Sequence, residues 1–172
     1  MAIVGSRKPS PKATETAYLI SQFLSEHRIV VASGLAEGID TAAHKATIEA
    51  HSQTLAVLGT PLDQVYPQKN CVLQQVIMQK HLAFSQFPIG TPIRPENFLQ
   101  RNKTLAQLTH ASVMVEAQPR SGSLNHASHA LKLGYPLFIY RPLNENQIWV
   151  QQMLTKGATL FEDPDEISRQ LK

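Results

Sequence analysis

The sequence has little cysteine, few aromatic residues and no long apolar run. Its 172 residues include one cysteine and one tryptophan, and aromatic residues make up 6%. Cys71 alone cannot form an intramolecular disulfide, which excludes a cross-linked secreted scaffold. No apolar run approaches the length of a membrane span, and the N-terminus, MAIVGSRKPS, lacks the features of a signal peptide. We therefore expect a cytoplasmic protein that does not associate with membranes.

The common enzyme signatures are also missing. No G-x-G-x-x-G follows the first apolar run, GSRKPS is not a Walker loop, and Ser121–Ser123 lacks the G-x-S-x-G frame of a nucleophile elbow. His126 and His129 lie three apart on a predicted helix, but no third metal ligand stands at a recognisable spacing. Asp40 falls early in a helix, where a carboxylate favours the helix dipole without any ligand. The sequence thus predicts no cofactor, no metal and no catalytic residue.

Composition and charge narrow the class of ligand. Hydrophobic residues make up 42% and charged residues 17%, as in ordinary globular proteins. The formal net charge is +3, with a pI near 9.1. This excess favours anionic partners but is modest, so any nucleic-acid site must concentrate the positive charge on one face.

Short β-branched runs alternate with helical periods along the whole chain. Apolar strands separated by helices of roughly ten to fifteen residues are typical of parallel βαβ units. We predict an α/β fold, a doubly wound, mostly parallel sheet of extended Rossmann-like type, in one domain covering residues 1–172. The predicted strands are 2–4, 29–32, 55–58, 82–85, 112–116, 137–140 and 158–161, and helices are predicted near 72–80, 98–109, 121–133 and 147–154.

Small residues follow several of these strands, where each strand passes into a turn or helix. In a doubly wound sheet such junctions meet at one edge, where ligands bind. Glycine lets the backbone approach an anion, and helix N-termini offer free N–H groups. Closure of tight turns alone explains one or two of these glycines, but four junctions together indicate a phosphate site. The junctions are Gly5-Ser6, Ser33-Gly34, Gly59-Thr60 and Ser121–Ser123; the basic residues near them are Arg7, Lys8, Arg101, Lys103 and Arg120.

These same residues carry a family resemblance over nearly the whole chain. The motifs occur in the order seen in the DprA/Smf DNA-processing family, which belongs to the wider SLOG superfamily. They are Gly5-Ser6-Arg7, the run Ser33–Asp40, Val57–Thr60 followed by Val65-Tyr66-Pro67, the element with Phe98 and Arg101-Asn102-Lys103, and Ser121–Leu124. The resemblance implies a Rossmann-like domain that binds single-stranded DNA, forms a homodimer and hands the strand to RecA during natural transformation and recombination. It implies no catalytic activity.

The resemblance also implies roles for individual residues. Arg7 would lie in the phosphate pocket, Arg101 and Lys103 on the DNA path, and Ser121–Ser123 would supply backbone donors. The full predicted DNA- or phosphate-binding set is Gly5, Ser6, Arg7, Lys8, Ser33, Gly34, Gly59, Thr60, Arg101, Asn102, Lys103, Ser121, Gly122 and Ser123.

Several positions depart from the family pattern. His126 stands where a Thr is usual, Lys103 where an Arg is usual, Gln86 in place of Glu and Gln107 in place of Gly. The segment 140–144 replaces a glycine-rich stretch that would form one wall of the crevice. No helical N-terminal domain or winged-helix C-terminal domain is expected in this chain.

Two other functions stay open from the sequence. One is a SLOG-type nucleotide-binding sensor or enzyme. The hydrolases of that superfamily carry Pro-Gly-Gly-x-Gly-Thr, whereas residues 118–123 here read QPRSGS, which counts against hydrolysis. The other is an interaction scaffold that no longer binds DNA, which the altered segment 140–144 favours.

Overall fold

The computed structural model describes residues 1–170 and contains a seven-stranded sheet in which every strand pair is parallel. The strand order is β4-β3-β2-β1-β5-β6-β7. The predicted doubly wound α/β fold is therefore confirmed, with a sheet that is wholly rather than mostly parallel. The strands are β1 (Ala2–Val4), β2 (Val31–Ser33), β3 (Thr54–Leu58), β4 (Leu82–Ser85), β5 (Ser112–Met114), β6 (Leu137–Tyr140) and β7 (Thr159–Phe161).

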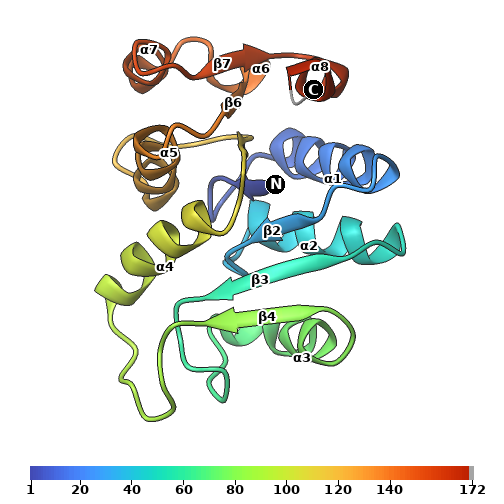
Figure 1. Ribbon diagram of the computed structural model, residues 1–172, viewed down its shortest axis with the longest axis vertical. Coiled ribbons are helices and arrows are strands. Elements are labelled where there is room, and N and C mark those ends of the chain that lie inside the picture. The colour runs from blue at the N-terminus through green and yellow to red at the C-terminus, as the bar shows by residue number, and fades with distance from the viewer. Residues whose placement is uncertain (171–172) are drawn as a thin grey trace.

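Helices cover both faces of the sheet, as Figure 1 shows. Helices α1, α2, α3 and α8 lie on one face, and α4, α5 and α7 lie on the other. The helices are α1 (Pro11–Glu26), α2 (Ile39–Glu49), the 3-10 turn η1 (Gln68–Asn70), α3 (Cys71–Lys80), α4 (Pro95–Gln107), α5 (Gly122–Lys132), the short α6 (Arg141–Asn144), α7 (Ile148–Leu154) and α8 (Pro164–Gln170).

Successive side chains of β5 and β6 pack into two separate hydrophobic cores, one on each face of the sheet. Val113 packs beneath α1 and α2, whereas the next residue, Met114, packs beneath α4 and α5. Phe138 and Ile139 divide in the same way, because successive side chains of a strand point to opposite faces. All four are fully buried, and each such side chain contributes about 1.5–3 kcal/mol to folding.

The order of the strands fixes where a ligand site can form. The chain winds from β1 outward to the edge strand β4, returns through α4, and resumes on the other side of β1 with β5. The direction of winding thus reverses between β1 and β5, and ligands of open α/β sheets bind at the carboxyl ends of strands at such a point. Helix α4 is the returning connection, so it lies beside this point.

Two predicted strands are shorter than their apolar runs. Ile29 and Val30 precede β2, because Arg28 adopts a positive φ of 57° and the Ile29 amide bonds to Leu24 O at 2.9 Å, closing α1. Strand β5 ends at Met114 rather than at Glu116. In the segment 140–144, Tyr140 ends β6 as predicted, and residues 141–144 form α6.

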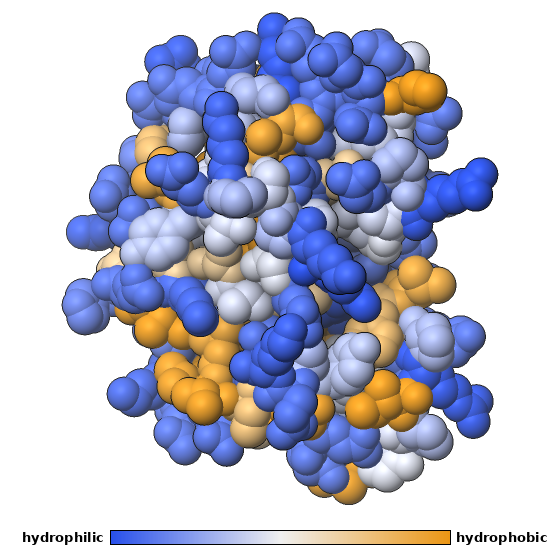
Figure 2. Space-filling model, turned by 180° about the vertical axis from the view of Figure 1, so that it is seen from behind, coloured by the Kyte–Doolittle hydropathy of each residue, from blue (hydrophilic) through white to orange (hydrophobic). Residues whose placement is uncertain are grey.

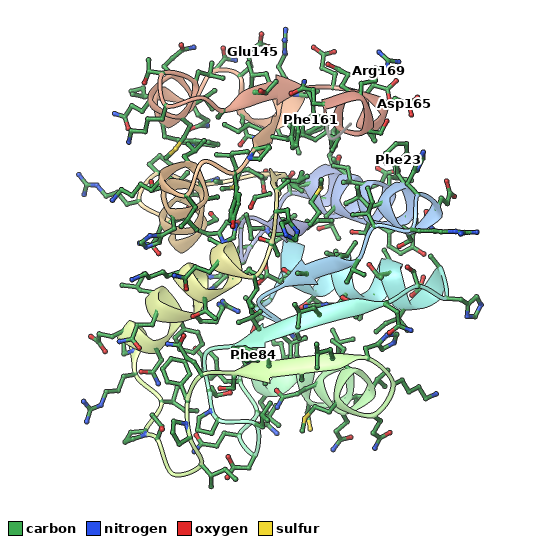
Figure 3. All side chains as sticks on the ribbon, in the orientation of Figure 1. Phe23, Phe84, Glu145, Phe161, Asp165 and Arg169 are labelled. Carbon is green, nitrogen blue, oxygen red and sulfur yellow. The ribbon has the colours of Figure 1, made fainter. Side chains whose placement is uncertain are left out.

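Surface character differs between the two ends of the molecule. Figure 2 shows apolar side chains gathered toward the lower end, which holds α3 and β4; the exposed apolar residues there include Val72, Leu82 and Phe84. Figure 3 places Glu145 and Asp165 at the opposite, upper end. Within residues 1–170, no helix combines the length and the apolar character needed to cross a membrane.

Candidate functional site

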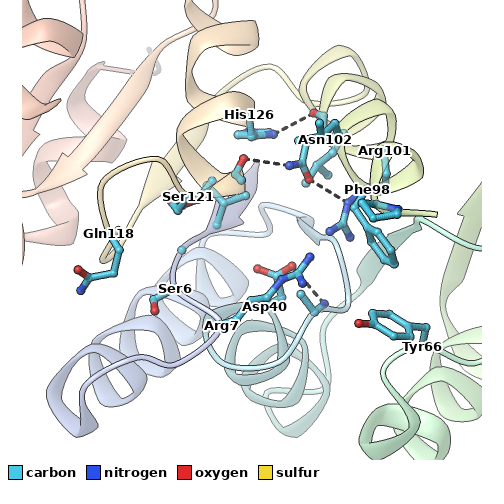
Figure 4. Close-up of a pocket in the computed structure, with 18 of the residues that line it drawn as sticks. Ser6, Arg7, Asp40, Tyr66, Phe98, Arg101, Asn102, Gln118, Ser121 and His126 are labelled. Carbon is cyan, nitrogen blue, oxygen red and sulfur yellow. Dashed lines mark hydrogen bonds between the residues drawn. The ribbon is translucent and has the colours of Figure 1, made fainter. Parts of the chain in front are cut away.

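A cavity of about 680 Å³ opens at the point between β1 and β5 where the winding reverses. Its walls come from the turn after β1, the start of α5 and one side of α4 (Figure 4). A smaller cavity of about 200 Å³ adjoins it and shares Arg7, Tyr66 and Arg101. The site is therefore built from segments that lie more than 100 residues apart in the sequence.

The turn after β1 is fixed by close packing. A Cβ at Gly5 would lie 2.6 Å from the Ile39 side chain and 2.9 Å from Glu116 O, so only glycine fits there. The Ser6 amide donates to Glu116 O at 2.8 Å, and Ser6 Oγ accepts from the Lys8 amide at 3.1 Å. This rigid turn leaves the side chains of Arg7 and Lys8 exposed at the cavity.

Arg7 lies over an aromatic pair on the opposite wall. Its Cζ is 5.5 Å from the ring centroid of Phe98, which is within the range of a cation–π contact. Phe98 in turn lies 5.0 Å from the ring of Tyr66, and a Cβ at Gly59 would come within 2.6 Å of the Phe98 ring. Gly59 therefore makes room for an aromatic side chain rather than for a phosphate.

Apolar residues of α4 and the preceding loop extend this aromatic wall. Ile93, Leu99 and Leu105 line the larger cavity beside Phe98, and Tyr66 is 45% exposed. Sequence analysis did not select any of these residues as part of the site. Tyr66 and Phe98 belong to motifs of the family resemblance, and this was the feature of the sequence that could have identified them as site residues.

Arg101 lies at the floor of the site and is almost completely buried. Its Nη1 donates to Gly34 O and, at 3.1 Å, to Val57 O, while its Nε donates to Asn102 Oδ1 at 3.0 Å. Burial lowers the pKa of Arg101, and the nearby Asp40 opposes that shift. The guanidinium thus ties the ends of β2 and β3 to α4 and contributes positive charge from below.

Asp40 also lines the cavity, where its carboxyl group has a structural role. Its Oδ2 accepts from the amides of Gly34 at 3.1 Å and Ala36 at 3.2 Å. Burial raises the pKa of this carboxyl, while Arg101 lowers it. Asp40 holds the turn between β2 and α2, in agreement with the structural role expected from the sequence.

A buried hydrogen-bond chain joins α4, α5 and β5. His126 Nδ1 lies 3.2 Å from Asn102 O, and since a carbonyl can only accept, Nδ1 carries the proton. Nε2 therefore accepts from Ser112 Oγ at 2.9 Å. Burial lowers the pKa of His126 to about 4, so the ring is neutral at pH 7. Asn102 Nδ2 donates to Gly122 O at 2.9 Å, which fixes the start of α5 against α4.

The N-terminus of α5 faces the cavity. Ser121, Gly122 and Ser123 all line it, and the two serine hydroxyls lie 2.7 Å apart. The first amides of a helix have no intrahelical acceptor, and the dipole favours an anion near them. Together with Arg7 and Lys8 across the cavity, this arrangement is suited to a phosphate group.

The structure brings most of the predicted site residues together, but not all of them. Ser33 is buried and donates to Ile3 O at 2.6 Å, and Thr60 is buried and donates to Gln64 O at 3.0 Å. Gly59 packs under Phe98, and the exposed Lys103 lies outside both cavities. The predicted residues that line one of the two cavities are Gly5, Ser6, Arg7, Lys8, Gly34, Arg101, Asn102, Ser121, Gly122 and Ser123.

Segment 140–144 does not line either cavity. The buried Asn144 donates to Val115 O at 2.8 Å and accepts from the Ala117 amide at 3.2 Å. This segment supports the loop after β5 from behind, so its divergence leaves the cavity walls intact. In the described part of the chain, no group of three or more His, Cys, Asp or Glu side chains could hold a metal ion.

The fold and the site define a class: a Rossmann-like protein with a cavity at the switch point of a doubly wound sheet. The family described as DNA recombination-mediator protein A matches residues 1–172, and the chain belongs to this family. Protein Smf of Escherichia coli K12 is 34% identical over 178 residues, covering the whole chain and 47% of that relative. DNA processing protein DprA of Streptococcus pneumoniae R6 is 39% identical over 138 residues, covering 80% of this chain and 49% of that protein. The chain thus spans about half the length of these curated relatives.

Solved structures give the same assignment. DprA from Streptococcus pneumoniae superposes with a TM-score of 0.89 at 34% identity, covering 98% of this chain and 60% of that one. A Helicobacter pylori structure, described in terms of a single-stranded DNA binding mode of DNA processing protein A, gives a TM-score of 0.87 at 27% identity, covering 99% of this chain and 78% of that one. A molybdenum cofactor carrier protein of Chlamydomonas reinhardtii shares the fold alone, at a TM-score of 0.68 and 14% identity, with 99% of this chain and 94% of that chain covered.

Proposed function

We propose that this chain binds single-stranded DNA in the cavity between β1, α4 and α5. The observation that carries the proposal is the pairing of two kinds of wall in one cavity. Arg7, Lys8 and the N-terminus of α5 form a cationic wall, and Tyr66 and Phe98 belong to the apolar wall opposite. A phosphate needs only the first wall, whereas a nucleotide with an unpaired base uses both.

The apolar wall favours a single strand over a duplex. Bases stack on aromatic side chains only where their faces are free, and each such stack contributes about 1–3 kcal/mol without regard to sequence. Binding is therefore proposed to be insensitive to sequence and to weaken with salt, as contacts to phosphate do.

The wider role follows from the family. We propose that the chain acts in DNA processing in the cytoplasm, protecting single strands and helping to load RecA during transformation and recombination, and that it works as a homodimer. Names of relatives that refer to DNA processing support the first part. A dimer would raise avidity, because two cavities on one strand act at a high effective concentration.

The proposal assigns no catalysis to the site. The carboxyl group of Asp40 and the imidazole of His126, which line the larger cavity, are both committed to structural hydrogen bonds. A general acid or base must reach the proton that it transfers.

A nucleotide-binding sensor is the second candidate. The smaller cavity, of about 200 Å³ beside Arg7 and Glu37, favours it because such a recess suits part of a mononucleotide. This candidate predicts tight binding of free nucleotides without affinity for longer strands.

Titration separates the two candidates. Oligothymidylates and free nucleotides are added to the wild type, to Arg7→Ala and to a matched control, Arg169→Ala, on the exposed surface of α8. We expect oligonucleotide binding that weakens with salt and with Arg7→Ala but not with Arg169→Ala. Tight nucleotide binding with no affinity for oligonucleotides would overturn the proposal in favour of the sensor.

A further inference from the structure

Beyond the first turn of α4, which holds the exposed Glu96, the outer surfaces of α4 and α5 carry positive charge without an acidic residue. Between Asn97 and Asn144 the sequence has a single acidic residue, Glu116. Its Oε2 accepts from the Ser10 amide at 3.0 Å, so this carboxylate is directed toward α1. The ion pairs found among residues 1–170 join Glu37 to Lys69 and Glu162 to Arg141, which leaves the lysines of α4 and α5 without a carboxylate partner.

Three basic residues on α4 and α5 follow one another away from the cavity: Lys103, His129 and Lys132. Asn102 and His126 line the cavity and are joined by the contact from His126 Nδ1 to Asn102 O. One residue further along α4 is Lys103, and one turn further along α5 is His129. Lys132 follows His129 by three residues on α5, so the two side chains lie on one face of that helix, which packs against α4. Burial, and then the charges of Lys132 and Lys103, lower the pKa of His129.

The line is accessible and long enough for more than one nucleotide. Lys103 and Lys132 are exposed, and His129 is half-buried between them. From Ser123 at the cavity to Lys132, α5 rises by about 13 Å at 1.5 Å per residue. Figure 1 shows α5 next to α4 on the same side of the sheet.

Charge is distributed unequally over the molecule, which singles out this surface. Glu145 and Asp165 lie at the upper end (Figure 3), in a segment rich in acids between residues 145 and 166. Diffusing polyanions are attracted toward surfaces of the opposite sign and away from those of like sign. A strand that leaves the cavity along α5 and the last turns of α4 passes exposed lysine side chains and no carboxylate of either segment.

We propose that Lys103, His129 and Lys132 form a second phosphate-binding strip, along which a DNA strand continues after it leaves the cavity. This inference rests on the proposed function, because it needs a strand in the cavity. It gives Lys103 a role outside the cavity and makes affinity depend on strand length.

The test compares strand lengths. Wild type and the double variant Lys103→Ala/Lys132→Ala are titrated with oligothymidylates of about three and about twenty nucleotides, which lie below and above ordinary single-strand site sizes of about 4–16 nucleotides. For the long strand we expect about a tenfold loss of affinity and a salt slope smaller by about 1.4, which is 0.7 for each lost phosphate contact. For the short strand, held in the cavity alone, we expect no change.

The matched control is Lys45→Ala/Lys80→Ala, which removes the same charge from exposed positions on α2 and α3. If the control weakens long-strand binding as much as the strip variant does, net charge is responsible and the inference is wrong. An unchanged salt slope in the strip variant overturns it as well. Failure of the proposed function is distinct, because the wild type would then bind neither strand.

Discussion

The guanidinium group of Arg101 occupies the space that a side chain at residue 34 would need. Gly34 O accepts from Arg101 Nη1, and the Gly34 amide donates to Asp40 Oδ2 at 3.1 Å. The glycine is therefore held from both sides by charged groups that are themselves buried. The absence of a side chain at residue 34 makes room for the buried guanidinium group of Arg101 beneath the cavity. It affects the ligand only indirectly.

This relationship predicts the cost of a methyl group. Gly34→Ala should lower the free energy of unfolding by about 1–3 kcal/mol, because the new Cβ displaces the buried guanidinium in a well-packed region. Gly122→Ala is the control, since its Cβ would come no closer than 3.4 Å to Asn102 Nδ2. Urea unfolding followed by circular dichroism measures both. Equal effects for the two substitutions would show that the packing argument is wrong.

Two buried histidines predict how stability depends on pH. Burial lowers the pKa of His126 to about 4 and that of His44 to about 3, from the ordinary 6.5. The native state therefore binds fewer protons than the unfolded state below pH 6.5, and the stability from these rings is lost as the pH falls. We expect a loss on the order of 1.4 kcal/mol per pH unit for each histidine across this window.

Asp40 changes stability in the opposite sense, because burial raises its pKa, so the informative quantity is the difference between variants. His126→Thr should remove the share of the slope that belongs to one histidine. His110→Gln, at an exposed position, should keep the whole slope. Denaturant titrations at a series of pH values measure this, and a His126→Thr slope equal to that of the wild type would contradict it.

Glu37 predicts a gain of affinity. Its side chain lines the smaller cavity beside Arg7 and Lys8, and its Oε2 lies 3.5 Å from Lys69 Nζ. The Glu37 carboxylate repels a bound phosphate directly. It also neutralises Lys69, which would otherwise attract the phosphate. Glu37→Gln should tighten oligonucleotide binding about two- to fivefold at low salt, with a smaller gain at high salt. Fluorescence anisotropy measures the affinity, with Glu15→Gln on the exposed surface of α1 as the control.

Tyr66 predicts a contribution from the bases. Because its ring is 45% exposed and packs against Phe98, Tyr66→Ala should lower oligonucleotide affinity by about five- to fiftyfold, as the loss of one stacked base does. An abasic strand of equal length should bind the wild type and the variant alike. Ile148→Ala, at an exposed residue of α7, should change neither affinity. A variant that loses affinity equally for both strands would show that Tyr66 does not contact bases.

The strands and the ligand-binding edge of the sheet could be predicted because apolar periodicity and small-residue junctions are local signals. Three junction glycines were read as openings for an anion, yet Gly5, Gly34 and Gly59 are needed by Ile39, Arg101 and Phe98. Each of these partner side chains lies on a different element from its glycine, and Arg101 follows Gly34 by 67 residues. A sequence does not show which protein atom fills the space that a glycine leaves.

Burial explains the remaining differences. Ser33 and Thr60 follow strands as a phosphate-binding residue would, but their hydroxyls bond to Ile3 O and Gln64 O. No local pattern of charge or small residues marks Tyr66 or Phe98, and a lone aromatic in a sequence is more often a core residue. Only the return of α4 across the sheet brings the two rings together beside Arg7.

That return of α4 has a consequence for cooperativity. The helix enters from the edge strand β4 and leads into the central strand β5, and on the way it supplies Phe98, Arg101 and Asn102 to the cavity. A ligand that contacts α4 therefore stabilises the two halves of the sheet, β1 to β4 and β5 to β7, against each other. Occupancy of the cavity would slow amide exchange in β2, β3 and α4 together, because partial unfolding of either half dismantles the binding surface.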